Sequence, residues 1–286
     1  MIPEQNAAGS GGNMATTMAH RLLKGTLLLT ITGFITRVLG FFYRIYLADL
    51  LGAHYLGIYQ LIFPVYAICF TIYGAGIQTA LSQVIASRKN DRENPSGCLR
   101  LFVIGTVIAM ALALLLQFLL SSNAEWVAIH FVMEVSLTPY LRIMTVFFPF
   151  CCLSACINGY YYGMNKAHIP SFSQIAEQMI RMGAVWLLVI YLEKNGKPVT
   201  VGLAVEGHVI GEMASAAFTF LALLLVPPQK GEREGGKERK NLVPILTLVL
   251  PLMGNRLVLN LLGSAEAILI PSRLIDHGLT NKEALS

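Results

Sequence analysis

Seven stretches of the chain are apolar and long enough to cross a lipid bilayer as a helix, which takes about 20 residues. They cover residues 25–48, 56–86, 101–120, 139–162, 172–192, 201–226 and 243–271. Charged residues make up only 13% of the chain, against about 25% in soluble domains. Because no water satisfies backbone groups inside a bilayer, stretches of this length are expected to be α-helices. The sequence therefore predicts an all-α polytopic membrane protein with about seven transmembrane helices.

The basic residues are distributed unevenly between the two sides of this predicted protein. With a cytoplasmic N-terminus, the inner loops and flanks hold twelve of them: Arg21, Lys24, Arg88, Lys89, Arg92, Arg100, Lys166, Lys230, Arg233, Lys237, Arg239 and Lys240. The outer loops between the first six stretches hold only Lys194 and Lys197. Lysine and arginine accumulate on the cytoplasmic side, so this bias predicts a cytoplasmic N-terminus. The net charge of +5 then reflects topology and contacts with anionic membrane lipids, and we expect no nucleic-acid partner.

The order of segments predicts four regions. Residues 1–20 contain no apolar run and are expected to be a disordered N-terminal extension. Residues 21–226 hold the first six membrane stretches, and residues 227–242 form a charged cytoplasmic linker. Residues 243–286 hold the seventh helix and a truncated outer loop. A seventh helix after a charged linker is typical of the start of a second bundle.

The first stretch carries two arginines on one helical face. Spacings of 4, 3, 4, 3 and 4 residues place six positions in one stripe: Thr26, Thr30, Gly33, Arg37, Gly40 and Arg44. A cation at the bilayer centre costs roughly 2.5–3.5 kcal/mol on insertion scales. Two guanidinium groups among small and hydroxyl residues therefore predict a water-filled cavity that binds an anion.

The second stretch repeats this pattern with small and polar residues at steps of three or four: Gly57, Gln60, Pro64, Ala67, Thr71, Gly74, Gln78 and Ser82. Close helix packing explains such a stripe equally well, because small residues let membrane helices approach each other. The two amide side chains, Gln60 and Gln78, favour a cavity wall instead.

Three later stretches also contain charged or amide residues. Glu177 and Arg181 are four residues apart with the acid first, which predicts a structural ion pair within one helix. Glu212 lies deep in the sixth stretch and is a candidate for proton or cation coupling. Arg256 and Asn260 share a face of the seventh stretch, where Arg256 is a candidate third cation.

Motifs of catalytic and metal sites are absent from the sequence. The chain has no phosphate-binding G-x-x-x-x-G-K-[ST], no H-E-x-x-H and no G-x-S-x-G. The five cysteines lack the histidine or acidic partners of a metal site, so we expect them to be packed membrane residues. The sequence predicts that the chain is not an enzyme and binds no metal or cofactor.

Several blocks of sequence resemble one transporter superfamily. They are KGTLLLTITGFITRVLGFFYR at 24–44, GIYQLIFPVYAICFTIYGAGIQTALSQ at 57–83, INGYYYGMNK at 157–166, SQIAEQMIR at 173–181 and NRLVLNLLGSAEAILIPSRL at 255–274. In order and content these blocks resemble the multidrug/oligosaccharidyl-lipid/polysaccharide (MOP) flippase superfamily. The likeness is strongest to its sporulation and polysaccharide-exporter branch, which is related to the lipid II flippases.

The resemblance implies a six-helix N-lobe followed by the first helix of a second lobe. It also implies a cationic cavity for an undecaprenyl-diphosphate-linked sugar in a bacterial plasma membrane. Arg37 matches an arginine of the lipid II flippases, whose second arginine falls where this chain has Tyr43. The next cation here is Arg44, and one residue rotates a side chain by about 100° around a helix. That shift favours the polysaccharide branch.

The predicted function is transport of this lipid-linked sugar by alternating access, without chemistry. Arg37, Arg44 and Arg256 would bind the diphosphate, and the sugar hydroxyls would contact a set of amides: Asn260, Gln60 and Gln78. The chain is expected to be inactive without the missing C-terminal half. A cation-coupled multidrug exporter is an alternative that the positive charges disfavour. A non-transporting scaffold for cell-wall synthesis proteins is another.

Overall fold

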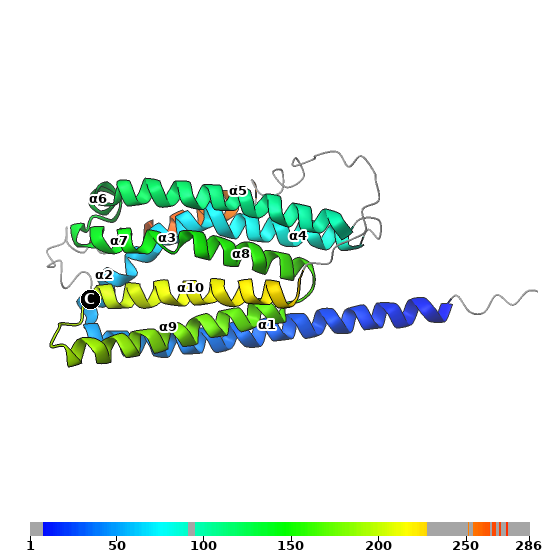
Figure 1. The fold of residues 1–286 in the computed structure, drawn as a ribbon, viewed down its shortest axis with the longest axis horizontal. Coiled ribbons are helices and arrows are strands. Elements are labelled where there is room, and N and C mark those ends of the chain that lie inside the picture. The colour runs from blue at the N-terminus through cyan, green and yellow to red at the C-terminus, as the bar shows by residue number, and fades with distance from the viewer. Residues whose placement is uncertain are drawn as a thin grey trace, which may run out of the picture.

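The computed structural model describes residues 8–90, 95–227, 251, 254–263, 265, 266, 269 and 273. Helices account for nearly all of the described chain (Figure 1). The α-helices are α1 (Ala8–Leu51), α2 (Ala53–Gln60), α3 (Ile62–Phe70), α4 (Gly76–Asn90), α5 (Pro95–Ser122), α6 (Ala124–Val127), α7 (Thr138–Thr145), α8 (Phe148–Gly163), α9 (His168–Lys194) and α10 (Val201–Leu225). Two π-helices, η1 (Thr71–Ala75) and η2 (Ala128–Val132), and one 3-10 helix, η3 (Val135–Leu137), lie between them.

The first six predicted membrane stretches are all present as helices. Five helices are long and apolar enough to span a bilayer: Gly25–Leu51, Ala53–Ser87, Cys98–Ser122, His168–Lys194 and Val201–Leu225. A sixth span consists of two helices, Val135–Thr145 and Phe148–Gly163, that meet at 52°. Pro149 in the first turn of α8 explains this bend, because proline disfavours a helical residue before it.

The seventh predicted stretch and the regions around it are described only in part. Residues 254–263 are helical, and most of 243–286 lies outside the described residues. The predicted linker at 227–242 lies outside them too, apart from Pro227. At the N-terminus, α1 begins at Ala8, where the sequence predicted a disordered extension over 1–20. Elongating an existing helix is much easier than nucleating one, so the apolar part of α1 carries the helix back into this stretch.

The outer surface of the bundle is apolar. Large side chains are more than half exposed on several helices, among them Phe34, Phe118, Trp126, Trp186 and Leu225. Soluble proteins rarely expose apolar patches on this scale. Together with the length and hydropathy of the helices, this surface identifies the bundle as a multi-pass membrane protein.

The second span is broken twice, and the breaks determine which of its residues face α1. The α-helix is interrupted at Leu61 between α2 and α3, where the backbone keeps helical dihedrals, and the π-helix η1 follows α3. Figure 1 shows α2 and α3 crossing from the α1 side of the bundle to the side of α4 and α5. Gly52 makes the preceding turn from α1 at a positive φ of 80°, a conformation that glycine adopts without strain. The end of α1 and the start of α2 therefore lie close together.

Glycines allow two pairs of helices to pack at close range. A Cβ at Gly159 of α8 would lie 2.7 Å from the backbone oxygen of Gln78 in α4. A Cβ at Gly207 of α10 would lie 2.2 Å from Val185 Cγ2 in α9. Small residues at such positions permit the backbone approach on which membrane helix packing depends. The α4–α8 pair and the α9–α10 pair are therefore closely packed.

We expect Gly159→Ala to destabilise the bundle, because the new methyl group meets backbone atoms that cannot rotate away. Overpacking of this kind costs about 1–3 kcal/mol. A lower melting temperature of the detergent-purified protein would show this. The matched control is Gly183→Ala in α9, where a Cβ meets nothing within 4 Å. Equal melting temperatures for the two variants would contradict the close α4–α8 approach.

Candidate anion-binding cavity

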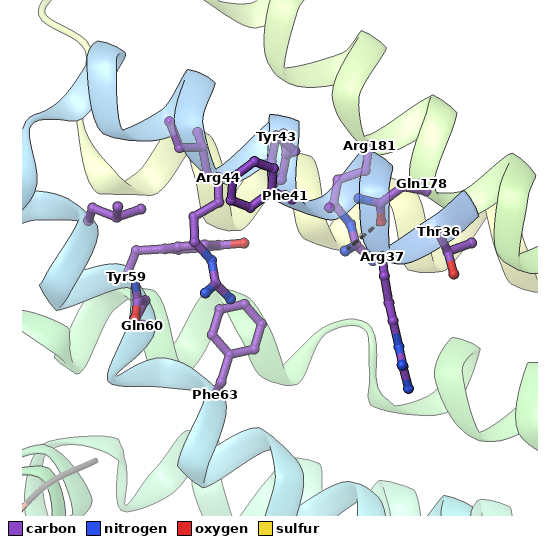
Figure 2. Close-up of a pocket in the computed structure, with 13 residues that line it drawn as sticks. Thr36, Arg37, Phe41, Tyr43, Arg44, Tyr59, Gln60, Phe63, Gln178 and Arg181 are labelled. Atoms are coloured by element: carbon purple, nitrogen blue, oxygen red, sulfur yellow. Dashed lines mark hydrogen bonds between the residues drawn. The ribbon is translucent and has the colours of Figure 1, made fainter. Parts of the chain in front are cut away.

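A cavity of about 440 Å³ lies between α1, the α2–α3 segment and α9 (Figure 2). Its lining is polar on several sides, with Thr36, Arg37, Tyr43, Arg44, Tyr59, Gln60, Gln178 and Arg181. The rest of the wall is apolar and consists of Gly40, Phe41, Leu47, Leu56 and Phe63. Three guanidinium groups therefore line one cavity, and no carboxylate is among its lining residues.

Arg37 and Arg44 reach the cavity from the same face of α1, as the stripe predicted. They are seven residues apart, which is two helical turns or about 10 Å along the axis. Figure 2 shows both side chains extending from α1 to the same side, with Arg44 ending beside Phe63. Neither forms a salt bridge within the described part of the chain. Gln60 of α2 lines the same cavity, as predicted.

The third cation of the cavity is Arg181 of α9. Its Nη2 forms the predicted ion pair with Glu177, one turn earlier on the same helix. Its Nη1 donates to Gln178 Oε1 at 3.4 Å, the dashed line in Figure 2. The side chain of Arg181 is only 13% exposed, so this guanidinium is far more enclosed than a surface arginine.

Gly40 and Gly211 have no side chain, and this leaves room for Gln178 and Arg181 of α9. A Cβ at Gly40 would lie 3.5 Å from Gln178 Nε2. A Cβ at Gly211 of α10 would lie 3.0 Å from Arg181 Cβ and 3.2 Å from its Nε. The approach of α1 and α10 to α9 at these glycines directs Gln178 and Arg181 along the helix surface toward the cavity.

Three predicted ligand residues do not line this cavity. Arg256 is exposed elsewhere, and Gln78 lies at the α4–α8 contact beside Gly159. Asn260 donates to Thr71 Oγ1 at 2.5 Å and to the Ala67 carbonyl oxygen at 3.3 Å. Gln60 and Gln78 separate because the break at Leu61 and the π-helix η1 shift the helical register that a continuous helix would keep.

Glu212 also lies outside the lining, in a buried cluster behind Arg181. It is 7% exposed, and its Oε1 is 3.8 Å from Nε2 of His208, one turn earlier on α10. Tyr66 and Cys151 are further polar neighbours of Glu212. The His208 ring is surrounded by aromatic rings, with centroid distances of 5.5 Å to Phe63, 5.9 Å to Tyr66 and 5.3 Å to Phe147.

Several cavity residues were not predicted as site residues. Thr36 and Tyr43 lie at helical spacing from Gly40 of the arginine stripe, and that spacing is a signal for them. Gln178 is adjacent to the predicted Glu177. The sequence contains no such signal for Tyr59 and Phe63, because the direction of these side chains depends on the interruption between α2 and α3.

The described residues contain no recognisable metal site. They contain no group of three His, Cys, Asp or Glu side chains that is arranged to hold a metal ion. All five cysteines are buried, and none of them forms a disulfide within the described residues. The cavity therefore offers hydrogen-bond donors and positive charge, which suit recognition of an oxyanion.

The family model for "polysaccharide biosynthesis protein" matches residues 22–279. The chain belongs to this family. It is 26% identical over 269 residues to stage V sporulation protein B of Bacillus subtilis, a match that covers 92% of this chain and 51% of that protein. It is 20% identical over 284 residues to the lipid II flippase MurJ of Bacillus subtilis, covering 91% and 51% respectively. The chain thus spans about half the length of these curated relatives.

Solved structures share the fold of this chain. An inward-facing multidrug resistance MATE family transporter of the MOP superfamily superimposes with a TM-score of 0.69 at 17% identity, over 91% of this chain and 59% of that chain. A MOP superfamily transporter from Pyrococcus furiosus gives 0.67 at 18% identity, over 82% and 52%. At these identities the likeness shows the fold alone.

Together these findings place the chain in the MOP flippase superfamily as a multi-pass membrane protein. Flippases and transporters move a substrate without altering its covalent structure. The family match therefore agrees with the prediction that this chain is not an enzyme.

We expect Glu177→Ala to lower the melting temperature, because it leaves the enclosed Arg181 without its carboxylate. A partly buried charge that loses its partner costs about 1–3 kcal/mol. The double variant Glu177→Leu/Arg181→Met should recover most of this loss, since apolar replacement of both partners removes the charges together. A double variant no more stable than Glu177→Ala would show that the pair does not balance charge in this way.

Proposed function

We propose that this chain is the cation-bearing lobe of a flippase for lipid-linked oligosaccharides. Its substrate class is a sugar attached through a diphosphate to a polyprenyl lipid, of the undecaprenyl type, used in polysaccharide or peptidoglycan-type envelope synthesis. The observation that carries this proposal is the cavity in which Arg37, Arg44 and Arg181 converge within membrane-spanning helices. The family match and the resemblance to the lipid II flippase support the same substrate class.

The cavity chemistry suits each part of such a lipid. Arginine donates paired hydrogen bonds to phosphate oxygens and keeps its charge at all relevant pH values. Gln60 and Gln178 carry donors and acceptors for sugar hydroxyls, and Tyr59 and Phe63 add ring faces. The polyprenyl tail remains in lipid beside the apolar helix surfaces. Binding therefore requires only the head group to enter the cavity.

Transport by alternating access needs a second lobe that closes over this cavity. MOP-type transporters rock two bundles against each other around a site near the middle of the membrane. We therefore infer that this lobe works with a second bundle and does not transport alone. The N-terminus is cytoplasmic in this proposal, and the membrane potential or an ion gradient drives the movement. Arg256 and Asn260, on the helix that follows the linker, are candidate contributors from the second lobe.

A multidrug exporter is the alternative that the fold itself raises, since the solved structures with a similar fold include multidrug transporters. The phenyl and phenol rings of the cavity would suit an organic cation. However, three guanidinium groups line the same wall without a carboxylate among the lining residues. Their charge repels cationic drugs, so the cavity favours an anionic ligand.

Binding of farnesyl diphosphate to the purified chain tests the proposed substrate class. We expect Arg37→Ala and Arg44→Ala each to weaken binding roughly 10- to 100-fold, the effect of losing a charge-assisted hydrogen bond worth about 1.5–3 kcal/mol. Isothermal titration in detergent measures this affinity. The matched control is Arg142→Ala, an exposed arginine of α7 that does not line the cavity.

Equal affinities for all three variants would overturn the assignment of the cavity. Competition by tetraphenylphosphonium at similar concentrations would favour the multidrug alternative instead.

A scaffold for cell-wall synthesis proteins would keep its function after Arg37 and Arg44 are neutralised together. Complementation of a flippase-deficient strain by the double variant, expressed with a second lobe, separates that alternative.

Reconstitution into liposomes tests the need for a second lobe. We expect the chain alone to bind a fluorescent prenyl diphosphate without moving it between leaflets, because one bundle cannot enclose the head group. A leaflet-specific quencher reports the distribution of the probe. Translocation above that of empty liposomes, and lost in Arg37→Ala, would contradict this expectation.

A further inference from the structure

We propose that binding of an anionic head group in the cavity is linked to uptake of a proton by Glu177, with Arg181 as the residue shared between them. This inference rests on the proposed function and adds a coupling reaction to it. It follows from the position of Arg181, which lines the cavity and also pairs with a carboxylate that does not.

Arg181 is the only residue in the described chain that belongs to both the cavity lining and a salt bridge. Its hydrogen bond to Gln178 is long, at 3.4 Å, and its Nε has no hydrogen-bond partner among the described residues. A guanidinium offers five donors, so part of this group remains available to a new acceptor. A diphosphate beside Arg37 and Arg44 would lie in the same cavity as these donors.

Polar groups from several helices surround Glu177. Ser215 and Glu212 face it from α10, and Cys151 faces it from α8. Ser215 shares hydroxyl hydrogen bonds with Ser173 at 2.9 Å and with Ser154 at 3.2 Å. On the other side of Arg181 the phenols Tyr43 and Tyr59 approach from α1 and α2.

The charges in this cluster do not balance without a bound proton. Two carboxylates, Glu177 and Glu212, face a single guanidinium, and burial makes an uncompensated carboxylate costly. The His208–Glu212 pair holds the balancing proton in the resting state, since both residues are buried and 3.8 Å apart. Arg181 then compensates Glu177, and the cluster is neutral.

An anion at Arg181 changes this balance. The diphosphate competes with Glu177 for the same guanidinium, and it adds negative charge near this partly buried carboxylate. A nearby like charge favours the protonated form of a carboxyl group. Glu177 therefore takes up a proton when the head group binds, and releases it when the head group leaves. Transport of the anion and movement of a proton become linked at one residue.

A small void lies next to His208. The void has a volume of about 10 Å³, close to the space of one water molecule. It shares Tyr59 and Phe63 with the cavity. Both ring nitrogens of His208 are buried without a hydrogen-bond partner among the described residues.

Titration of the chain with farnesyl diphosphate at pH 8 tests the proposal, because the ligand is then ionised and contributes little proton exchange of its own. Calorimetry in HEPES and in Tris, which have different ionisation enthalpies, gives the number of protons taken up. We expect about one proton per bound ligand. We expect Glu177→Gln to bind the ligand without uptake. The matched control, Glu212→Gln, should retain the uptake.

The wild-type chain provides a second measurement that does not depend on the folding of a variant. Its affinity should fall by up to about tenfold per pH unit above pH 8, because binding takes up a proton. Arg37-dependent binding with neither proton uptake nor this pH dependence would overturn the inference and leave the proposed function standing. Uptake that persists in Glu177→Gln, or that disappears in Glu212→Gln, would also overturn it. Absence of Arg37-dependent binding would overturn both proposals.

Discussion

A guanidinium group inside a membrane is stable only beside water, a counter-ion or the headgroup region. This requirement limits where the three arginines of the cavity can lie. The structure meets it in two ways within one cavity. Arg37 and Arg44 face the open space, whereas Arg181 pairs with Glu177 on its own helix. Among the described residues, the cavity therefore presents two cations without a salt bridge and one cation paired with a carboxylate.

The positions of these three arginines depend on packing that the arginines do not provide. Gly207 and Gly211 let α10 lie directly against α9, which encloses Arg181 and brings Glu212 and His208 behind it. The turn at Gly52 and the break at Leu61 place α2 opposite the end of α1. Small residues and helix breaks thus shape a polar cavity in a protein whose outer surface is apolar. Larger residues at the glycines would separate the helices and change the surroundings of every cavity cation.

The chain spans about half the length of the curated relatives it matches. In the proposed function this bundle forms one wall of a binding cleft, and a second lobe supplies the opposite wall. The concentration of positive charge on this wall suits the diphosphate of a lipid-linked sugar. The substrate class is our proposal from this charge and from the family match. The arrangement of Arg181, Glu177 and the buried pair on α10 is a property of this chain's own residues.

The sequence by itself determined the membrane class, the first six spans, the Arg37–Arg44 face and the Glu177–Arg181 ion pair. Each of these depends on local periodicity or on residues within one or two helical turns, which a linear pattern records. Only the tertiary structure decided that Arg181 completes the cavity, and that Gln78, Arg256 and Asn260 lie outside its lining. For Arg181 and Gln78 the outcome depends on the interruptions at Leu61 and η1 and on the close approach of α9 to α10. For Asn260 it depends on contact with Ala67 and Thr71, which are far away in the sequence. Such features rotate whole helical faces relative to one another, and no spacing within a single helix contains that information.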